Sequence, residues 1–246
     1  MSYLQFAPLR AFRAARVVAA DPDQLPEVFT IIESLSITTL QRIGRRMQES
    51  ETGRRLIEER PDIVERLADR EGLRRLPAGS LGRTYLAFVE RENISAQGIR
   101  DAAKAGMKHD GDIPAPLDFV HQRMRDTHDL WHAVTGYSGD VLGEAALLAF
   151  TFAQTHNPGI AFIIAIAIAK TANAPLGGGK EARRVMRDGF RRGRKAAWLP
   201  EQEWESMLAL PIEEVRARLG IDAPPTYETL RTSTLRAEGV LATVAA

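Results

Sequence analysis

The 246-residue sequence contains no cysteine. Disulfides, iron–sulfur clusters, cysteine-rich zinc folds and thiol nucleophiles are therefore excluded, and a metal centre would depend on histidine and carboxylate ligands. An excess of one charge is also missing, because 33 lysines and arginines stand against 32 aspartates and glutamates. This balance gives no electrostatic reason to expect a nucleic-acid partner.

An uninterrupted apolar run of membrane-spanning length is lacking as well. The nearest candidate, residues 145–169, carries no Asp, Glu, Lys or Arg, but His156-Asn157-Pro158-Gly159 interrupts it in the manner of a helix–helix corner. The pattern favours two buried helices over one transmembrane span.

Patterns typical of β-strands are nearly missing, since valine, isoleucine and threonine rarely alternate with polar residues. Stretches rich in alanine, leucine, arginine and glutamate dominate, and each is closed by glycine, proline or a capping residue. The sequence predicts an all-α fold, a single-domain multi-helix bundle. The expected helices cover about residues 7–19, 25–35, 38–48, 51–59, 61–69, 80–92, 95–107, 116–133, 139–156, 158–173, 179–196, 201–208 and 211–219.

We expect three parts along the chain: an N-terminal amphipathic helix in residues 1–24, a helical metal-binding domain in residues 25–222, and a loosely ordered tail in residues 223–246. In the first part no acidic residue precedes Asp21. Three arginines recur among apolar side chains; they are Arg10, Arg13 and Arg16, beside Leu4, Phe6, Leu9 and Phe12. This pattern fits a targeting peptide or membrane-surface helix, or a first helix packed on the core through its apolar stripe. We favour packing on the core.

A cluster of metal-ligand residue types lies in the second half of the chain. His128 and His132 are four residues apart and share a helix face, with Asp129 close to that edge. Glycines then break the helix, and Glu144 lies one turn into the next one. Antiparallel packing would bring Glu144 back to the histidines and form an open His₂-carboxylate₂ site for a divalent transition metal. The alternative is a polar helix face without a metal.

Two further polar residues, His121 and Arg125, fall on the same helical stripe as the histidine pair. Arg125 either presents its guanidinium to a carboxylate or phosphate near the metal, or pairs with a neighbouring aspartate. His121 either takes part in the chemistry or is an ordinary surface or core histidine.

The residues of this cluster resemble a known signature. Arg125-Asp126-Thr127-His128-Asp129-Leu130-Trp131-His132, followed by Gly136 and Gly143-Glu144, is similar to the HDxxHx₁₁E motif of the coenzyme Q (ubiquinone) biosynthesis protein 4 family. The resemblance extends over roughly residues 25–222. Its other segments are Leu76-Pro77-Ala78-Gly79-Ser80-Leu81-Gly82-Arg83, Trp198-Leu199, Glu203-Trp204-Glu205 and Val215-Arg216-Ala217-Arg218-Leu219-Gly220-Ile221.

The resemblance implies a divalent metal, usually zinc, held by His128, Asp129, His132 and Glu144. It also implies removal of the carboxyl group at ring carbon 1 of a polyprenylated hydroxybenzoate precursor. His121, Arg125 and a metal-bound water are candidates for delivering a proton or orienting the acid in that reaction. The alternatives are a non-catalytic isoprenoid-binding scaffold that organises other quinone-biosynthesis proteins, and an enzyme acting on another isoprenoid. The expected setting is cytoplasmic, peripheral on the inner face of a membrane, with a homodimer as a further expectation.

An isoprenoid tail needs a long apolar groove. Residues 160–169 mix isoleucine with alanine around the whole helix, so this segment is either a central core helix or one wall of a lipid tunnel. The basic run that follows, from Arg183 to Lys195, is either a solvated helix face or a surface for anionic lipid headgroups.

Overall fold

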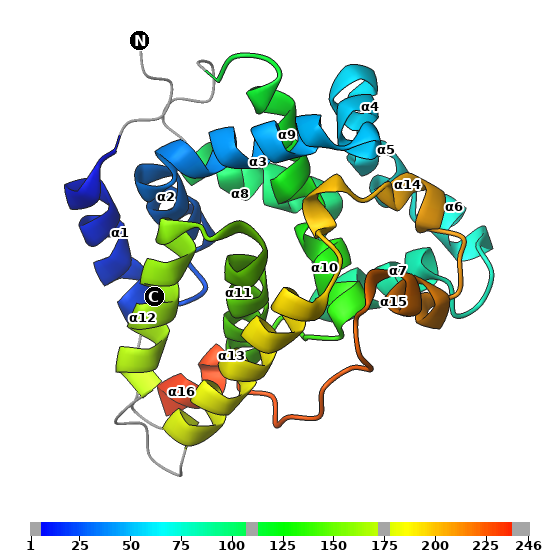
Figure 1. Ribbon diagram of the computed structural model, residues 1–246. Coiled ribbons are helices and arrows are strands. Elements are labelled where there is room, and N and C mark those ends of the chain that lie inside the picture. The colour runs from blue at the N-terminus through cyan, green and yellow to red at the C-terminus, as the bar shows by residue number, and fades with distance from the viewer. Residues whose placement is uncertain (1–5, 107–112, 172–177, 238–246) are drawn as a thin grey trace.

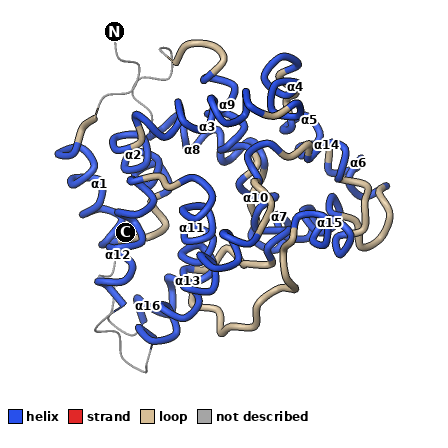
Figure 2. Tube along the Cα trace, viewed as in Figure 1, coloured by secondary structure: helices blue, strands red, loops and turns tan. Residues whose placement is uncertain are grey.

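The computed structural model describes residues 6–106, 113–171 and 178–237. Within these ranges the chain forms helices and connecting loops and no strand (Figure 2), so the predicted all-α fold is confirmed. The first helices are α1 (Pro8–Ala20), α2 (Leu25–Leu35), α3 (Ile37–Glu49), α4 (Glu51–Glu59), α5 (Ile63–Ala68), α6 (Arg70–Arg75), α7 (Leu81–Glu92) and α8 (Ala96–Gly106). The later ones are α9 (Leu117–Asp126), α10 (His128–Thr135), α11 (Val141–Thr155), α12 (Pro158–Thr171), α13 (Gly178–Lys195), the 3₁₀ turn η2 (Leu199–Glu201), α14 (Trp204–Met207), α15 (Ile212–Leu219) and α16 (Thr232–Ala237).

The helix expected over residues 116–133 is two helices, because α9 ends at Asp126 and α10 begins at His128. The Thr127 hydroxyl donates a hydrogen bond of 2.8 Å to the Arg123 carbonyl one turn earlier, a bond that commonly bends helices. The break places His128 in the first turn of a new helix instead of the middle of a long one.

Helix α11 lies in the middle of the molecule (Figure 1) and is buried along most of its length. It packs closely along α13 because Gly189 and Gly193 of α13 carry no side chain. A Cβ at Gly189 would lie 2.3 Å from the Ala146 carbonyl oxygen, and one at Gly193 would lie 2.5 Å from that of Phe150. This contact fixes the helix that carries Glu144.

Two buried arginines hold the C-terminal end of α10. Arg216 of α15 donates from Nε to the Val134 carbonyl at 2.9 Å, and Arg192 of α13 donates to the Thr135 carbonyl at 2.8 Å. Cations are favourable at this end of a helix because its last carbonyls lack partners within the helix. Arg192 is therefore a core residue, and the basic run of α13 is not one continuous solvated face.

The apolar helix α12 forms a side of the molecule, packed against α1, α2 and α11. Ile160 and Ile163 are buried, whereas Ile168 is 38% exposed. Over the described part of the chain, no helix combines the length and apolar character needed to cross a membrane.

Helix α1 packs on α2 and α12 through small side chains, since Ala11, Ala14, Ala15 and Val18 are its buried residues. Leu9 and Phe12 point outward and are 75% and 59% exposed. Helix α1 thus packs on the rest of the molecule as expected, but through a stripe of small side chains that allows close helix contact and not through Leu9 or Phe12.

The segment after residue 222 is bound along the molecule, in contrast to the expected loose tail. The Tyr227 hydroxyl donates to Asp140 Oδ2 and accepts from the Ser138 amide, both at 2.9 Å. The Leu230 amide donates to Asp140 Oδ1 at 2.9 Å, and the Thr232 hydroxyl donates to Asp23 Oδ1 at 2.7 Å. No local pattern reveals these distant acceptors. The rest of the tail, residues 238–246, lies outside the described residues.

Candidate metal centre

His132 is a buried residue of α10 with one ring nitrogen already bonded to the protein. Its Nδ1 lies 3.0 Å from the Tyr137 carbonyl oxygen, which can only accept, so Nδ1 carries the proton. Its ring stacks on Phe88 of α7, with ring centroids 4.9 Å apart. In the neutral ring the lone pair available to a metal is therefore on Nε2, the nitrogen that faces Glu144.

His128 is arranged in the same way. Its Nδ1 lies 3.1 Å from Asp129 Oδ1, and its Nε2 lies 3.9 Å from Glu144 Oε2. A carboxylate on Nδ1 fixes the tautomer and the ring orientation, as is common for metal-binding histidines.

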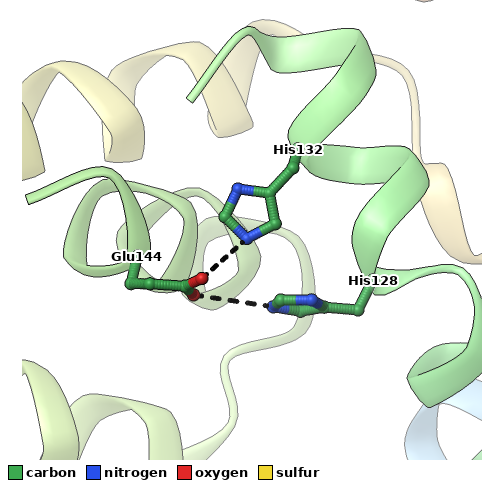
Figure 3. A group of neighbouring side chains, drawn as sticks. All are labelled: His128, His132 and Glu144. Atoms are coloured by element: carbon green, nitrogen blue, oxygen red, sulfur yellow. Dashed lines mark ion pairs between the residues drawn. The ribbon is translucent and has the colours of Figure 1, made fainter. Parts of the chain in front are cut away.

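Glu144 faces both histidines from α11. The N-terminus of that helix is capped by Asp140, whose Oδ1 accepts from the Leu142 amide at 3.1 Å. Glu144 Oε1 lies 3.2 Å from His132 Nε2, and Figure 3 shows the carboxylate pointing between the two rings. One ligand atom from each of the three residues lies within 4.8 Å of the other two.

The charges of the group are strongly coupled. Burial by itself would lower the pKa of His132, but the Glu144 carboxylate, together with Asp129 and the Tyr137 carbonyl, raises it above its ordinary value. Partial desolvation opposes ionisation of Glu144, whose side chain is 40% exposed, yet His132 and His128 hold the pKa of Glu144 below its ordinary value. Glu144 is therefore a carboxylate that attracts a cation, and a divalent ion would compete with the proton on His132.

The three residues fit a divalent metal. His132 Nε2 is buried and makes no hydrogen bond of regular geometry, although Glu144 Oε1 is near it. Two imidazole nitrogens and one carboxylate oxygen are a known zinc ligand set, and three protein ligands leave a coordination position open for water or substrate.

Asp129 lies beside this group and not within it. Its placement on His128 Nδ1 makes it an orienting partner, and the role of metal ligand predicted for it stays a prediction. Three of the four predicted ligands therefore have ligand atoms that converge.

His121 and Arg125 lie on α9 and are not among the three converging residues. His121 Nε2 is 3.9 Å from Glu33 Oε1 of α2, and Arg125 Nε donates to Asp126 Oδ1 at 2.8 Å. Both side chains line the same cavity as His128 and Glu144. The two stripe residues on α9 thus share the cavity with His128 and Glu144 but are not among the three residues whose ligand atoms converge.

Two of the three residues, His128 and Glu144, form part of the wall of a cavity of about 1150 Å³, whereas His132 is buried and is not part of the lining. This volume exceeds the range of about 300–1,000 Å³ that is usual for small-molecule sites. The lining is mainly apolar and includes Val28, Phe29, Ile32, Leu40, Ile43, Leu148, Ile160, Ile163, Ile166 and Met186. The centre therefore faces a space suited to a ligand with a large apolar part.

Several residues of the site were not predicted from the sequence. Glu33 reaches the cavity from α2, Phe88 supports His132 from α7, and Tyr137 supplies a backbone carbonyl. Each acts across helices that are distant in sequence or through the main chain, so no spacing pattern indicates it.

Known proteins are similar to this chain in sequence and in fold. A family model described as coenzyme Q (ubiquinone) biosynthesis protein Coq4 matches residues 4–225. The ubiquinone biosynthesis protein coq4, mitochondrial, of Talaromyces stipitatus is 34% identical over 192 residues, which are 78% of this chain and 63% of that protein. The corresponding protein of Scheffersomyces stipitis is 27% identical over 85% of this chain and 63% of its own length. This chain thus spans somewhat less than two thirds of these relatives.

The crystal structure of a putative ubiquinone biosynthesis protein from Nostoc punctiforme has the same fold. It superposes with a TM-score of 0.64 at 21% identity, covering 89% of this chain and all of that one. With the match of the family model over nearly the whole chain, the protein described here belongs to the Coq4 family of ubiquinone biosynthesis proteins.

Proposed function

We propose that this protein decarboxylates ring carbon 1 of a polyprenylated hydroxybenzoate with a divalent metal, zinc being the first candidate. The observation that carries the proposal is the convergence of His128, His132 and Glu144, two of which, His128 and Glu144, line a large apolar cavity. A hydrophilic reacting ring would lie at the metal group, and the prenyl tail would lie along the apolar lining.

When bound, the metal would supply a Lewis-acidic contact for the carboxylate or phenolate of the ring. Loss of carbon dioxide breaks the bond between C1 and the carboxyl carbon, leaves the electron pair on the ring and requires a proton at C1. His121 Nε2, beside the Glu33 carboxylate, is the proposed proton donor. Arg125, which lines the cavity, would orient the acid.

The test is turnover by the purified protein. Metal content is measured first, and a short-chain prenylated hydroxybenzoate is then supplied while carbon dioxide is collected. We expect Glu144→Ala and His128→Ala to lower the rate at least about a hundredfold, since each removes a metal ligand. Arg66→Ala, an exposed residue of α5, is the matched control and should keep full activity. Full activity in the two ligand variants would contradict the metal mechanism.

A second candidate function is that of a non-catalytic carrier or scaffold, which presents a prenylated intermediate to other quinone-biosynthesis proteins. The size and apolar lining of the cavity favour it. Tight binding of the prenylated acid without carbon dioxide release, unchanged in Glu144→Ala, is the result that this role predicts. Turnover of a different isoprenoid acid would instead indicate a related enzyme.

The proposed setting is the cytoplasmic side of a membrane, whereas the curated relatives carry mitochondrial names. A homodimer stays a prediction, to be tested by light scattering of the purified protein.

A further inference from the structure

Helices α10 and α11, which carry the metal group, are joined by a turn formed by residues 136–140. Two contacts of the metal group depend on this turn. The Tyr137 carbonyl lies 3.0 Å from His132 Nδ1, and the Glu144 amide donates to the Asp140 carbonyl at 2.8 Å. The position of the turn therefore determines how His132 and Glu144 face each other.

The turn is held from outside by a C-terminal segment, residues 222–230, which is part of the coil between α15 and α16 (Figure 1). Tyr227 makes the central contact. Its hydroxyl accepts from the Ser138 amide and donates to Asp140 Oδ2, both at 2.9 Å. One hydroxyl thus joins the middle of the turn to its last residue.

Asp140 depends on the C-terminal segment for most of its hydrogen bonds. The residue is only 1% exposed, and a buried carboxylate needs donors to replace water. Its own helix supplies the Leu142 amide at 3.1 Å, whereas the segment supplies the Tyr227 hydroxyl and the Leu230 amide, both at 2.9 Å. The Val141 amide in turn donates to the Leu230 carbonyl at 2.9 Å. The start of α11 is therefore fixed by a distant part of the chain.

Two glycines allow the C-terminal segment to lie directly against the turn. Gly136 has a φ of +79°, and a Cβ there would lie 2.5 Å from Pro224 Cβ. A Cβ on Gly143, in the first turn of α11, would lie 2.5 Å from the Tyr227 hydroxyl oxygen. The Tyr227 ring also lies beside that of Tyr137, with centroids 6.2 Å apart. The segment thus contacts both ends of the turn.

We propose that the C-terminal segment is a positioning element of the metal centre and that Tyr227 is its principal positioning residue. Tyr227 acts through the turn and not as a ligand: it holds the turn so that the Tyr137 carbonyl stays on His132 and Glu144 stays opposite Nε2. Tyr227 lies beyond residue 225, where the match of the family model ends. The proposal rests on the metal group of the proposed function, but not on the decarboxylation.

The first test is Tyr227→Phe in the full chain, with Co²⁺ alone as the probe, since Co²⁺ accepts imidazole and carboxylate ligands. We expect the Co²⁺ affinity to fall at least about fivefold, which is less than the ten- to hundredfold typical of a partner bonded directly to a ligand. The visible absorption of bound Co²⁺ should also change, because it depends on coordination geometry. A loss of stability alone would leave that spectrum unchanged.

The second test needs neither metal nor substrate. In metal-free protein labelled at its histidine nitrogens, NMR measures how fast the Nδ1 proton of His132 exchanges with water. This proton lies on the Tyr137 carbonyl, so its exchange reports the position of the turn. Tyr227→Phe should speed the exchange at least about tenfold, because the turn loses a hydrogen bond to a buried carboxylate and opens more often.

The matched control is Thr232→Val, which is nearly isosteric and removes a hydrogen bond just after the same segment. The buried Thr232 hydroxyl donates to Asp23 Oδ1 at 2.7 Å, and Asp23 lies between α1 and α2. Urea denaturation should show a lower free energy of unfolding in both variants. Thr232→Val should nevertheless keep the Co²⁺ affinity, the Co²⁺ spectrum and the His132 proton exchange of the wild type.

Wild-type affinity, spectrum and exchange in Tyr227→Phe would overturn the proposal. Equal changes in Thr232→Val would also overturn it, because the effect would then follow from stability alone. Failure of the wild type to bind Co²⁺ or zinc would contradict the metal of the proposed function. The proton exchange would then decide on positioning by itself: faster exchange in Tyr227→Phe than in Thr232→Val would support it, and equal exchange would overturn it.

Discussion

At the scale of single residues, each histidine of the metal group has one ring nitrogen committed to the protein. The Tyr137 carbonyl holds Nδ1 of His132, and Asp129 holds Nδ1 of His128. Both Nε2 atoms therefore face Glu144 with the correct tautomer for metal binding. The four-residue spacing of the histidines predicted that they share a face, but it could not indicate which nitrogen would point at a metal.

The role of Asp129 can be separated from that of a ligand. If Asp129 only orients His128, Asp129→Asn should weaken zinc binding by no more than about ten- to a hundredfold. The loss is limited because the amide oxygen can still accept from Nδ1. Competition with a chromophoric chelator measures this affinity. A loss as large as that in His132→Ala would contradict the orienting role and identify Asp129 as a ligand.

At the scale of elements, the helices that carry the site are held by contacts between distant parts of the chain. The sequence predicted most helices because amphipathic period, caps and prolines are local signals. The bend at Thr127, the short helix α6 and the terminal helix α16 were not predicted. They depend on hydrogen bonds and packing partners that local patterns do not encode.

The crossing of α11 and α13 depends on Gly193. Gly193→Ala would place a methyl group 2.5 Å from the Phe150 carbonyl oxygen, so the two helices must move apart. We expect the free energy of unfolding to fall by about 1–3 kcal/mol. Urea denaturation measures it, with Gly98→Ala in α8, where only the Ser95 side chain lies within 4 Å, as the control. Equal stability of both variants would show that the close crossing is not required.

An ionic cluster joins α5, α8 and α9 near the site. Arg100 Nη2 lies 2.6 Å from both Asp62 Oδ1 and Asp126 Oδ2. The Arg100 guanidinium holds the pKa of Asp62 below its ordinary value of 3.8. This contribution to stability is therefore complete above the ordinary pKa and is lost as the pH falls through the lowered one.

Asp62→Asn should lower the free energy of unfolding by about 0.5–1 kcal/mol at neutral pH, since Asp62 is partly exposed and screened. Asparagine also caps helices, so the cap that Asp62 provides to Val64 is kept. The difference from the wild type should shrink as the pH is lowered below about 4. A difference that is constant from pH 7 to pH 3 would contradict the ionic origin. Asp222→Asn, in the exposed pair with Lys195, is the control with a smaller expected effect.

At the scale of the whole molecule, the fold places His128 and Glu144 of the metal group on the wall of a large apolar cavity. It also leaves large apolar side chains of α1 exposed, Leu9 and Phe12 among them. The all-α class and the convergence of His128, His132 and Glu144 were predicted from the sequence. Composition indicates the class, and helical spacing with antiparallel packing of the next helix brings the three side chains together. The lining of the cavity could not be predicted in the same way, since it comes from helices throughout the chain. For α1 the sequence left two alternatives open, a surface-bound helix and a helix packed on the core, because an apolar stripe does not indicate what covers it.

The central claim is that His128, His132 and Glu144 hold a divalent metal, and the most direct measurement is metal stoichiometry after equilibrium dialysis against zinc. The wild type should bind about one zinc ion per chain, and the nearly isosteric Glu144→Gln should bind at least about a hundredfold more weakly, because it loses the anionic ligand. Glu181→Gln, which neutralises a carboxylate of α13 that lies outside the metal group, should bind zinc like the wild type. Equal zinc binding by the wild type and Glu144→Gln, or no zinc binding by the wild type, would contradict the account.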